Sequence, residues 1–439
     1  MNKKVVNNVV WIIGCRIIKV LLATFVSIFT ARMLGPDDYG IINYASSMTN
    51  IISPFVLLGF NSILVHELIN RYNNTDEGTI LGTAIFSSLV CSLGGIILST
   101  LMVYLIAPSD KVAIAVTAVY STTLVFQSLE LIQYWFQAKY RSNVVALVGV
   151  IAYVVISVYK TLLLYWDVSI YWFAFSHAFD YFIISAVLFY LYRKDNNPKL
   201  KFSKNTFKHL VDIGKYYMIS SFMVTMFTQI DKLMIKSMLG NQANGLYAVA
   251  VTCSGMFIFV FSAIIEAMRP YVLEGKNTNE EVFEQRIGLL YSILIYLAIG
   301  FSFIVSIVSD VLIKVLYGSE YAVSSDILKV LIWYIPFTCI GGVKDIWILS
   351  EGKQKYLLPI NTSGAIVNAV LNLLFISKYG LVGVAVATVV SQIFSNVLIC
   401  AFICDLRRNI SILWKSLNPT VLISGVKVLF VKVKEKCKR

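Results

Sequence analysis

The sequence predicts an all-α polytopic membrane protein of about twelve transmembrane helices, built as two related six-helix bundles. Two observations predict this fold. Of the 439 residues, 58% are hydrophobic and only 14% are charged, whereas soluble domains carry roughly 25% charged residues. The hydrophobic residues also stand in long blocks separated by short polar segments. A chain whose surroundings are lipid has this pattern.

Two groups of six apolar blocks are long enough to cross a bilayer. The first six lie at 9–31, 41–65, 79–106, 112–136, 143–165 and 170–192, and the second six at 214–239, 245–268, 287–308, 325–350, 357–377 and 382–404. We therefore expect an N-terminal bundle at 1–192, a basic cytoplasmic linker at 193–213, a C-terminal bundle at 214–404 and a basic cytoplasmic tail at 405–439. Within the tail, the apolar segment 418–433 is an interfacial helix or the start of a further span.

The lysines and arginines give the orientation. Most of the 37 cations fall in segments that this map places on one side of the membrane, and the loops on the other side hold only Arg32, Lys111, Lys314 and Lys378. Because cytoplasmic loops carry the excess of Lys and Arg, both termini are expected in the cytoplasm. The net charge of +13 then reflects membrane orientation, and no nucleic-acid partner is expected.

The two halves share a sequence repeat. Met33-Leu34-Gly35, Gly40 and Ala45 recur at a constant offset as Met238-Leu239-Gly240, Gly245 and Ala250. Each half has an even number of spans, so the two copies enter the membrane in the same direction. Parallel repeats of this kind are related by a pseudo-two-fold axis along the membrane normal, and the substrate site is expected between them.

The first span carries two cations near its middle. Arg16 and Lys19 are three residues apart and share one helix face. A cation costs about 2.5–3.5 kcal/mol at a helix centre, and each apolar residue gains only about 0.3–0.6 kcal/mol. The span would be marginal if both cations faced lipid, so we expect them to face protein or water. Ala23, Ser27 and Thr30 continue the same small and polar face.

The seventh span, which leads the second half, carries a similar stripe. Its members are Thr225, Gln229, Lys232 and Lys236, with Asp231 beside them. We expect the two stripes to face each other across a central, water-accessible cavity that binds an anion. The alternative is that each cation pairs with a buried carboxylate, such as that of Asp231, Glu130, Asp180 or Glu266.

Acidic and histidine side chains in the spans suggest an ion or proton pathway. His177 and Asp180 lie three residues apart in the sixth span and, with Asp231, could couple transport to an ion or proton. A hydrogen bond between helices is the plainer interpretation of this pair. Lys344 and Asp345 are expected to pair with each other or with nearby groups, and Lys160 is expected to reach the interface from its span end.

No motif of an enzyme or a cofactor site is present. The seven cysteines form no CxxC pair and no Cys/His cluster, so neither a disulfide framework nor a zinc site is expected. The sequence also lacks a GxxxxGK[ST] loop, HExxH, GxSxG and a dinucleotide fingerprint. We therefore expect no cofactor, no bound metal and no enzymatic activity.

Three segments resemble a known family. Ala31-Arg32-Met33-Leu34-Gly35-Pro36-Asp37-Asp38-Tyr39-Gly40, followed by Asn43-Tyr44-Ala45, resembles the signature after the first helix of polysaccharide transporters, the Wzx-type flippases of O-antigen and capsule repeat units. Gln229-Ile230-Asp231-Lys232-Leu233-Met234-Ile235 resembles the seventh helix of that family, and Gly380-Leu381-Val382-Gly383-Val384-Ala385-Val386-Ala387-Thr388 its twelfth. The resemblance extends over about residues 1–410. Many relatives continue into two more helices, where this chain has its basic tail.

The resemblance implies a fold and a substrate. The family belongs to one superfamily with the multidrug and toxin extruders and the peptidoglycan lipid flippases, in which two six-helix bundles form a V around a cavity. The implied substrate is a polyprenyl-pyrophosphate-linked oligosaccharide, moved by alternating access from the cytoplasmic to the outer leaflet of the bacterial cytoplasmic (inner) membrane. The implied partners are the lipid bilayer, a repeat-unit polymerase and a chain-length regulator.

Other functions remain as alternatives. A drug or organic-cation antiporter of the same fold should carry carboxylates in its lead helices, where this chain carries cations. A membrane glycosyltransferase or repeat-unit polymerase should carry a large outward loop with catalytic motifs. A scaffolding membrane protein would not need buried cations on matched faces of both halves.

Overall fold

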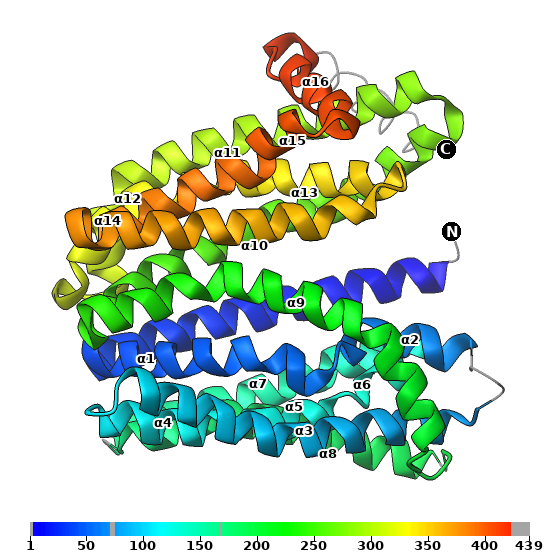
Figure 1. The fold of residues 1–439 in the computed structure, drawn as a ribbon, viewed down its shortest axis with the longest axis vertical. Coiled ribbons are helices and arrows are strands. Elements are labelled where there is room, and N and C mark those ends of the chain that lie inside the picture. Colours follow the sequence, from blue (N-terminus) through cyan, green and yellow to red (C-terminus); the bar gives the residue numbers. More distant parts are fainter. Residues whose placement is uncertain (1–2, 71–74, 167, 196, 423–439) are drawn as a thin grey trace. The chain divides into compact units, whose positions relative to one another are not determined.

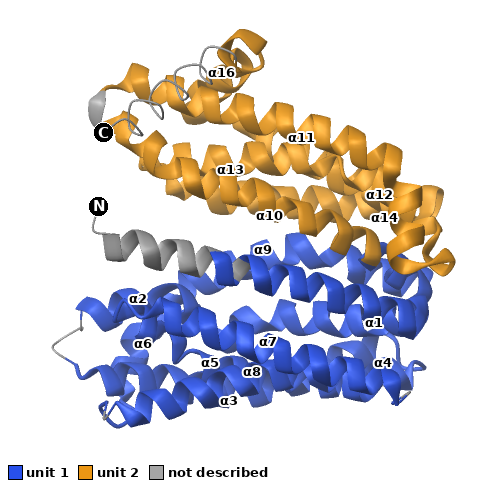
Figure 2. Cartoon of the chain, turned by 180° about the vertical axis from the view of Figure 1, so that it is seen from behind, with its two compact units in different colours: residues 1–248 blue, residues 249–439 orange. Residues whose placement is uncertain are grey.

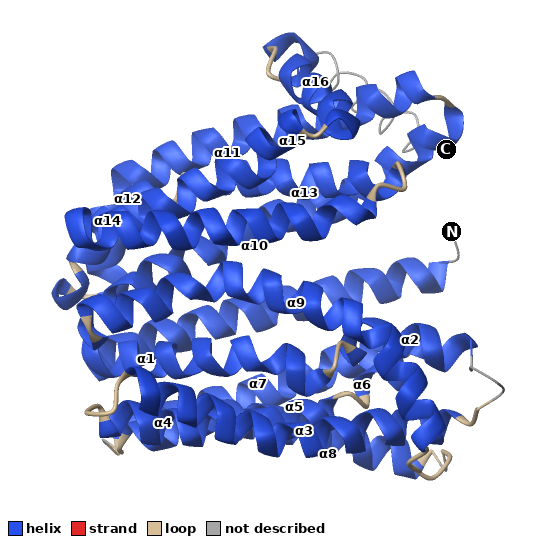
Figure 3. Cartoon of the chain, in the orientation of Figure 1, coloured by secondary structure: helices blue, strands red, loops and turns tan. Residues whose placement is uncertain are grey.

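The structure of the chain is a computed structural model that describes residues 3–70, 75–166, 168–195 and 197–422 (Figure 1). Side chains are described for these residues except 3–13, 16, 277 and 278. Within these ranges the chain forms helices and connecting loops and contains no strand (Figure 3). The prediction of an all-α polytopic membrane fold is confirmed.

The chain divides into two compact units, residues 1–248 and 249–439 (Figure 2). The sequence placed the boundary of the bundles at the linker 193–213, whereas the units divide within the helix that follows the seventh span. The reason is that residues 204–239 lie along the first helix of the chain. Ser47 donates a hydrogen bond to Gln229 at 2.9 Å, and the backbones meet at Gly59 and Gly214, where a Cβ atom on either residue would overlap the other segment.

Unit 1 contains nine α-helices and the start of a tenth in its described residues. These are α1 (Lys3–Leu57), α2 (Phe60–Asn70), α3 (Glu77–Ile106), α4 (Lys111–Ser121), α5 (Thr123–Glu130), α6 (Gln133–Ala138), α7 (Ser142–Tyr165), α8 (Ile170–Lys194), α9 (Lys204–Leu239) and the first residues of α10 (Asn241–Thr278). The predicted fourth span, 112–136, is thus divided among α4, α5 and α6.

Unit 2 continues α10 and adds helices up to residue 416. They are α11 (Glu280–Tyr317), η2 (Ser319–Tyr321), α12 (Val323–Leu331), α13 (Tyr334–Ser350), η3 (Gln354–Tyr356), α14 (Leu357–Ile393), the π-helix η4 (Phe394–Leu398), α15 (Ile399–Phe402), η5 (Cys404–Leu406) and α16 (Arg407–Ser416). The predicted tenth span, 325–350, is divided between α12 and α13, as the fourth span of the first half is also divided.

Two long helices each contain one predicted span and the first part of the next. Gly35 interrupts α1 with φ 73° and ψ 171°, and Gly380 interrupts α14 with φ 56°. Glycine adopts such angles at little cost. After Gly35 the sequence reads Pro36-Asp37-Asp38, and proline followed by acidic residues favours the start of a new helix. The sequence therefore ends the first helical segment of α1 and begins the second within three residues.

The apolar surface of the helices agrees with a lipid environment. Nine stretches of the described residues are long and apolar enough to cross a membrane, two of which contain the interrupted helices α1 and α14. The polar helix α9 is not among these nine. Large apolar side chains are exposed along the helices, for example Ile97 and Leu105 on α3 and Val311 on α11. Lipid tails satisfy such side chains, whereas water would not.

The connection between α8 and α9 and the segment after α15 are ordered by specific contacts. Among the described residues of the expected linker, 195 and 197–203 lie outside helices, and the Lys201 N–H donates to the Gly78 carbonyl oxygen at 3.2 Å. In the expected tail, α16 packs on α11, where the Tyr291 hydroxyl contacts the Asn409 amide oxygen at 3.0 Å. The segment 418–433 lies beyond residue 422 for most of its length and so outside the described residues.

Candidate functional site

Lys19 lies in the wall of a cavity of about 700 Å³ inside unit 1. Besides Lys19 of α1, the wall contains Glu130 of α5, Gln133 and Gln137 of α6, and Ser142 and Gly149 of α7. Gly149 lies opposite the lysine, since a Cβ atom there would be in ordinary van der Waals contact with Nζ at 3.8 Å. The ammonium group lies 5.9 Å from the centre of the Tyr153 ring. The cavity is therefore polar and contains both a cation and a carboxyl group.

Lys19 and Arg16 were expected to face the stripe of α9. The α1 backbone is helical at both positions, but the Arg16 side chain lies outside the described residues. No residue of α9 is among the described residues that line the Lys19 cavity, which lies among α1, α5, α6, α7 and α8. Lys232 is therefore not among the described residues that line the Lys19 cavity.

Two acidic side chains lie near Lys19 without forming an ion pair with it. Glu130 and Asp180 are within electrostatic range of its charge, but neither carboxylate lies within 4 Å of Nζ among the described groups. One carboxylate oxygen of Asp180, Oδ1, is buried and has no hydrogen-bond partner among the described residues. Lys160 is only 8% exposed, so the expectation that it reaches the interface is wrong. It too lies within electrostatic range of Asp180.

His177 contacts an aromatic ring in the interior of unit 1. The His177 and Tyr120 ring centroids are 4.8 Å apart, and the Tyr120 hydroxyl donates to Ser46 of α1 at 3.0 Å. No hydrogen bond joins His177 to Asp180 within the described part of α8. His177 and Asp180 therefore lie one turn apart on α8, but their side chains have different surroundings.

The stripe of α9 contains side chains with different partners. Gln229 accepts a hydrogen bond from Ser47, and Asp231 accepts one from the Tyr247 hydroxyl at 2.8 Å. Lys232 is half-buried, and no ion pair joins its ammonium group to a described carboxylate, although Asp231 is next to it in the chain. Lys236, in contrast, is buried and forms an ion pair with Asp110.

Asp110, the ion-pair partner of Lys236, was not predicted from the sequence. It lies in the short connection before α4, where its side chain also accepts from the Ala113 N–H at 3.0 Å and from the Asn241 amide at 3.2 Å. Burial acts to raise the pKa of Asp110, but these bonds and the charge of Lys236 outweigh it and hold the pKa below its usual value. An Asp directly before an apolar helix is an N-cap signal, yet it gives no hint of a lysine 126 positions later.

Three other intramembrane cations of the described residues, Lys236, Lys329 and Lys344, have ion-pair partners, whereas the buried Lys160 forms no ion pair with a described carboxylate. Lys344 lies 3.6 Å from Asp345, which confirms their expected pairing, and donates to the Asn396 amide oxygen at 2.9 Å. Lys329 pairs with Asp310 and Asp326. No group of three His, Cys, Asp or Glu side chains within the described ranges could hold a metal ion. Lys19 and Lys232 thus differ from Lys236, Lys329 and Lys344, and resemble Lys160, in having no ion-pair partner among the described groups.

Comparisons with known proteins agree on one family. The family model described as polysaccharide biosynthesis protein matches residues 29–326. The chain is 22% identical to the capsular polysaccharide biosynthesis protein CapF of Staphylococcus aureus over 88% of this chain and 96% of CapF. It is 20% identical to a proposed O-antigen transporter of Shigella flexneri, over 90% of this chain and 96% of the relative.

A solved structure has the same fold. The inward closed conformation of the lipid II flippase MurJ superposes with a TM-score of 0.74 at 15% identity, over 96% of this chain and 92% of MurJ. At this level of identity the likeness concerns the fold alone.

Proposed function

The chain belongs to the polysaccharide biosynthesis protein family, and we propose on that basis that it is a flippase for a polyprenyl-pyrophosphate-linked oligosaccharide. In this proposal the protein moves the repeat unit of a surface polysaccharide, O-antigen or capsule, from the cytoplasmic to the outer leaflet by alternating access of its two halves. The names of the relatives support this function, since one concerns capsular polysaccharide biosynthesis and another O-antigen transport.

The observation that carries the proposal is the state of two lysines in the lead helices. Lys19 and Lys232 are half-buried, Lys19 in the wall of the polar cavity, and neither forms an ion pair with a described carboxylate. An ammonium group in a membrane-spanning helix is costly unless it meets water or an anion, and such groups mark substrate pathways. The pyrophosphate of the ligand has the charge and the acceptor oxygens that lysine and arginine bind. Arg16 is proposed to act with Lys19.

The competing functions fit these features less well. An organic-cation antiporter needs anionic groups where its substrate binds, whereas the lead helices present lysines. A polymerase needs room for an outward catalytic loop. The connections on the side away from the termini are short in the described residues: 107–110 between α3 and α4, Gly240 between α9 and α10, and Gly318 after α11.

Asp180 is the group that we assign to ion or proton coupling. Its buried and unpaired Oδ1 atom lies in the same half as Lys19 and Lys160, where uptake of a cation or proton would compensate its charge. His177 and Asp231 are weaker members of this assignment, because the ring of His177 contacts Tyr120 and Asp231 is bonded to Tyr247. A transport rate that does not respond to a sodium or pH gradient would remove the assignment.

The location and the partners follow from the proposed transport. Multiple apolar helices make this a multi-pass membrane protein, and we assign it to the bacterial inner membrane with both termini in the cytoplasm. A ligand delivered to the outer leaflet is the substrate of a repeat-unit polymerase under a chain-length regulator, so these two proteins are proposed as partners. Crosslinking in membranes followed by mass spectrometry tests the association.

A reconstituted transport assay tests the function. The full chain is placed in proteoliposomes with a fluorescent polyprenyl-pyrophosphate oligosaccharide in one leaflet, and its transfer is measured for wild type, Lys19→Ala, Lys232→Ala and Arg16→Ala. Lys329→Ala is the control, because that lysine lies in an exposed ion-pair network. Loss of transfer in the first three variants alone supports the proposal. Absence of transfer by wild type, together with export of a small organic cation, overturns it.

A further inference from the structure

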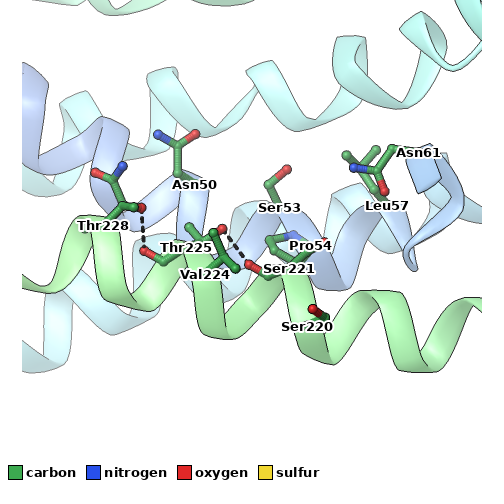
Figure 4. Close-up of a pocket in the computed structure, with 11 residues that line it drawn as sticks. Asn50, Ser53, Pro54, Leu57, Asn61, Ser220, Ser221, Val224, Thr225 and Thr228 are labelled. Atoms are coloured by element: carbon green, nitrogen blue, oxygen red, sulfur yellow. Dashed lines mark hydrogen bonds between the residues drawn. The ribbon is translucent and has the colours of Figure 1, made fainter. Parts of the chain in front are cut away.

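A second cavity of unit 1, of about 430 Å³, lies between α1 and α2 on one side and α9 on the other. We call it the neutral groove. Figure 4 shows Asn50, Ser53 and Asn61 on the first wall, and Ser220, Ser221 and Thr225 on the second. Its volume lies within the range of about 300–1,000 Å³ that small-molecule sites occupy.

The groove is lined by hydrogen-bonding side chains without charge. Residues with hydroxyl or amide side chains make up most of the lining, and none of the described lining residues is acidic or basic. Polar side chains lower the stability of a membrane-spanning helix unless they meet a hydrogen-bonding partner. Their concentration on two facing helices therefore indicates that the groove meets something polar and neutral. The apolar side chains Leu57 and Val224 interrupt this lining.

Part of the lining is held in place by bonds within the protein. The Ser53 hydroxyl donates to Gln127 at 3.0 Å, and the Thr225 hydroxyl donates to the Ser221 carbonyl oxygen at 2.8 Å. Gln229, at one end of the groove, is fixed by its bond to Ser47 at 2.9 Å. These bonds position the side chains but use only part of their hydrogen-bonding capacity, because each hydroxyl or amide can make more than one bond.

Other groups of the wall have unused capacity. The amide oxygen of Asn61 is buried and has no partner among the described residues. Pro54 lacks an N–H, so the Asn50 carbonyl has no donor four residues later in α1. The hydroxyl groups of Ser220 and Ser221 donate to no described residue. A buried acceptor without a donor destabilises the protein, and a ligand with hydroxyl groups would supply the missing donors.

These features distinguish between the parts of a lipid-linked oligosaccharide. The pyrophosphate needs cations, which the groove lacks, and the polyprenyl chain needs an apolar wall. A sugar carries neutral hydroxyl groups around its ring and apolar C–H faces, which match the amides and hydroxyls together with Leu57 and Val224. We infer that the neutral groove is the subsite that holds the sugar residues next to the pyrophosphate.

The position of Lys232 agrees with this assignment. It follows Gln229 by three residues, so it shares the helix face of the groove end and lies about 4.5 Å further along α9. The pyrophosphate is joined directly to the first sugar in the ligand. One helix would thus present a cation to the pyrophosphate and hydroxyl groups to the sugar. This inference rests on the proposed function and names the part of the ligand that this half of the site recognises.

The test compares two probes on the full chain in lipid nanodiscs. One probe is a short-chain polyprenyl pyrophosphate that carries an N-acetylhexosamine disaccharide, and the other is the same lipid without sugar. Wild type is expected to bind the glycosylated probe about tenfold more tightly, which corresponds to one or two net hydrogen bonds. Thr225→Val and Asn61→Leu keep the size of the side chain and remove its hydrogen bonding. They are expected to reduce this preference to about twofold without changing the affinity for the bare lipid.

Thr161→Val is the matched control. Thr161 is exposed on α7 and donates to the Ser157 carbonyl oxygen at 2.8 Å, as Thr225 does to Ser221, so it should leave both affinities unchanged. The inference is overturned if wild type does not distinguish the probes, or if the groove variants retain the full preference. It is also overturned if the variants weaken both probes equally. Failure of wild type to bind either probe would instead contradict the proposed function itself.

Discussion

Gly40 and Gly245 lie backbone to backbone inside unit 1. A Cβ atom on Gly40 would overlap the Asn241 carbonyl oxygen, and one on Gly245 would overlap the Pro36 carbonyl oxygen. The contact is reciprocal in sequence as well, because Pro36 and Gly40 in the first repeat correspond to Asn241 and Gly245 in the second. Reciprocal contact between equivalent residues is what a two-fold relationship produces. The second segment of α1 and the start of α10 approach each other closely at these residues, which explains why glycine recurs at both positions of the repeat.

Alanine at either glycine is expected to destabilise the protein. The added methyl group has no space, and backbone atoms cannot move aside as a flexible side chain could, so the cost should be about 1–3 kcal/mol or more. The measurement is the thermal unfolding temperature of purified Gly40→Ala and Gly245→Ala in detergent.

Gly94→Ala provides the control for this prediction. Gly94 lies in α3 with no atom within 4 Å of an added Cβ, and alanine there should stabilise the helix by about 0.5–1 kcal/mol. If Gly40→Ala unfolds at the same temperature as Gly94→Ala, the close approach does not exist in solution.

The ion pair of Lys236 with Asp110 should act on stability more than on transport. It joins the end of α9 to the connection before α4, and its lysine already has a carboxylate partner. Asp110→Asn should therefore lower stability by about 1.5–3 kcal/mol, the range for hydrogen bonds to charged groups. Transfer by the folded variant should stay near that of wild type. Equal loss of transfer in Asp110→Asn and Lys232→Ala would contradict this division of roles.

The effect of Asp110→Asn should also depend on pH. Because the folded pKa of Asp110 is lowered, its contribution is complete above the unfolded pKa of about 3.9 and disappears as the pH falls through the folded pKa. The gap in unfolding temperature between wild type and variant should thus narrow between pH 5 and pH 3. Asp326→Asn, which alters an exposed pair with Lys329, should give a small gap throughout. A gap for Asp110→Asn that widens on acidification would refute the assignment.

The sequence predicted the features of this fold that depend on local pattern. The apolar helices and the repeat follow from hydropathy and from glycines at a constant offset, and Lys344 and Asp345 pair because they are neighbours in the chain. Broken helices were missed, since the break at Leu131 and Ile132 lies inside a block that is apolar on average, although Glu130 and Gln133 flank it directly. Hydropathy does not detect a change of direction within an apolar block.

The candidate site was harder to predict because it depends on partners that are distant in sequence. Lys232 and Lys236 are four residues apart on one helix and are indistinguishable by pattern, yet only Lys236 meets an acid. The neutral groove was missed for another reason. Asn50, Ser53 and Asn61 carry no charge, and single polar residues in an apolar span attract attention only when another helix brings matching groups opposite them.

Glu77 is expected to be a major source of stability at the start of α3. Its side chain is 8% exposed and accepts from the Trp135 indole N–H at 2.9 Å and from Lys139 at 2.7 Å. Glu77→Ala leaves the buried indole N–H without its acceptor, and the cost should be about 1.5–3 kcal/mol. Glu281→Ala, which removes an exposed acid from the first turn of α11, is the control for loss of a helix-dipole contact alone. Equal unfolding temperatures for the two variants would show that the Trp135 and Lys139 contacts add nothing.

In unit 2, the buried contact of Lys344 with Asn396 should show strong coupling between two substitutions. Lys344 is 3% exposed, and its ammonium group donates to the Asn396 amide oxygen at 2.9 Å. Asn396→Leu leaves the buried ammonium without this acceptor, which should cost about 3 kcal/mol or more. Lys344→Met removes the charge and retains most of the side-chain length, so its cost should be about 1–2 kcal/mol.

The double variant shows whether the destabilisation by Asn396→Leu depends on the charge of Lys344. Once the charge is absent, Asn396→Leu no longer strands a buried ammonium, so Lys344→Met with Asn396→Leu should be more stable than Asn396→Leu alone. The thermal unfolding of all four proteins closes a double-mutant cycle, in which a coupling of about 1–3 kcal/mol is expected for residues in contact. Additive effects would mean that the two side chains are independently solvated. The lysine would then have to be balanced by Asp345, whose carboxylate lies 3.6 Å away and is half exposed.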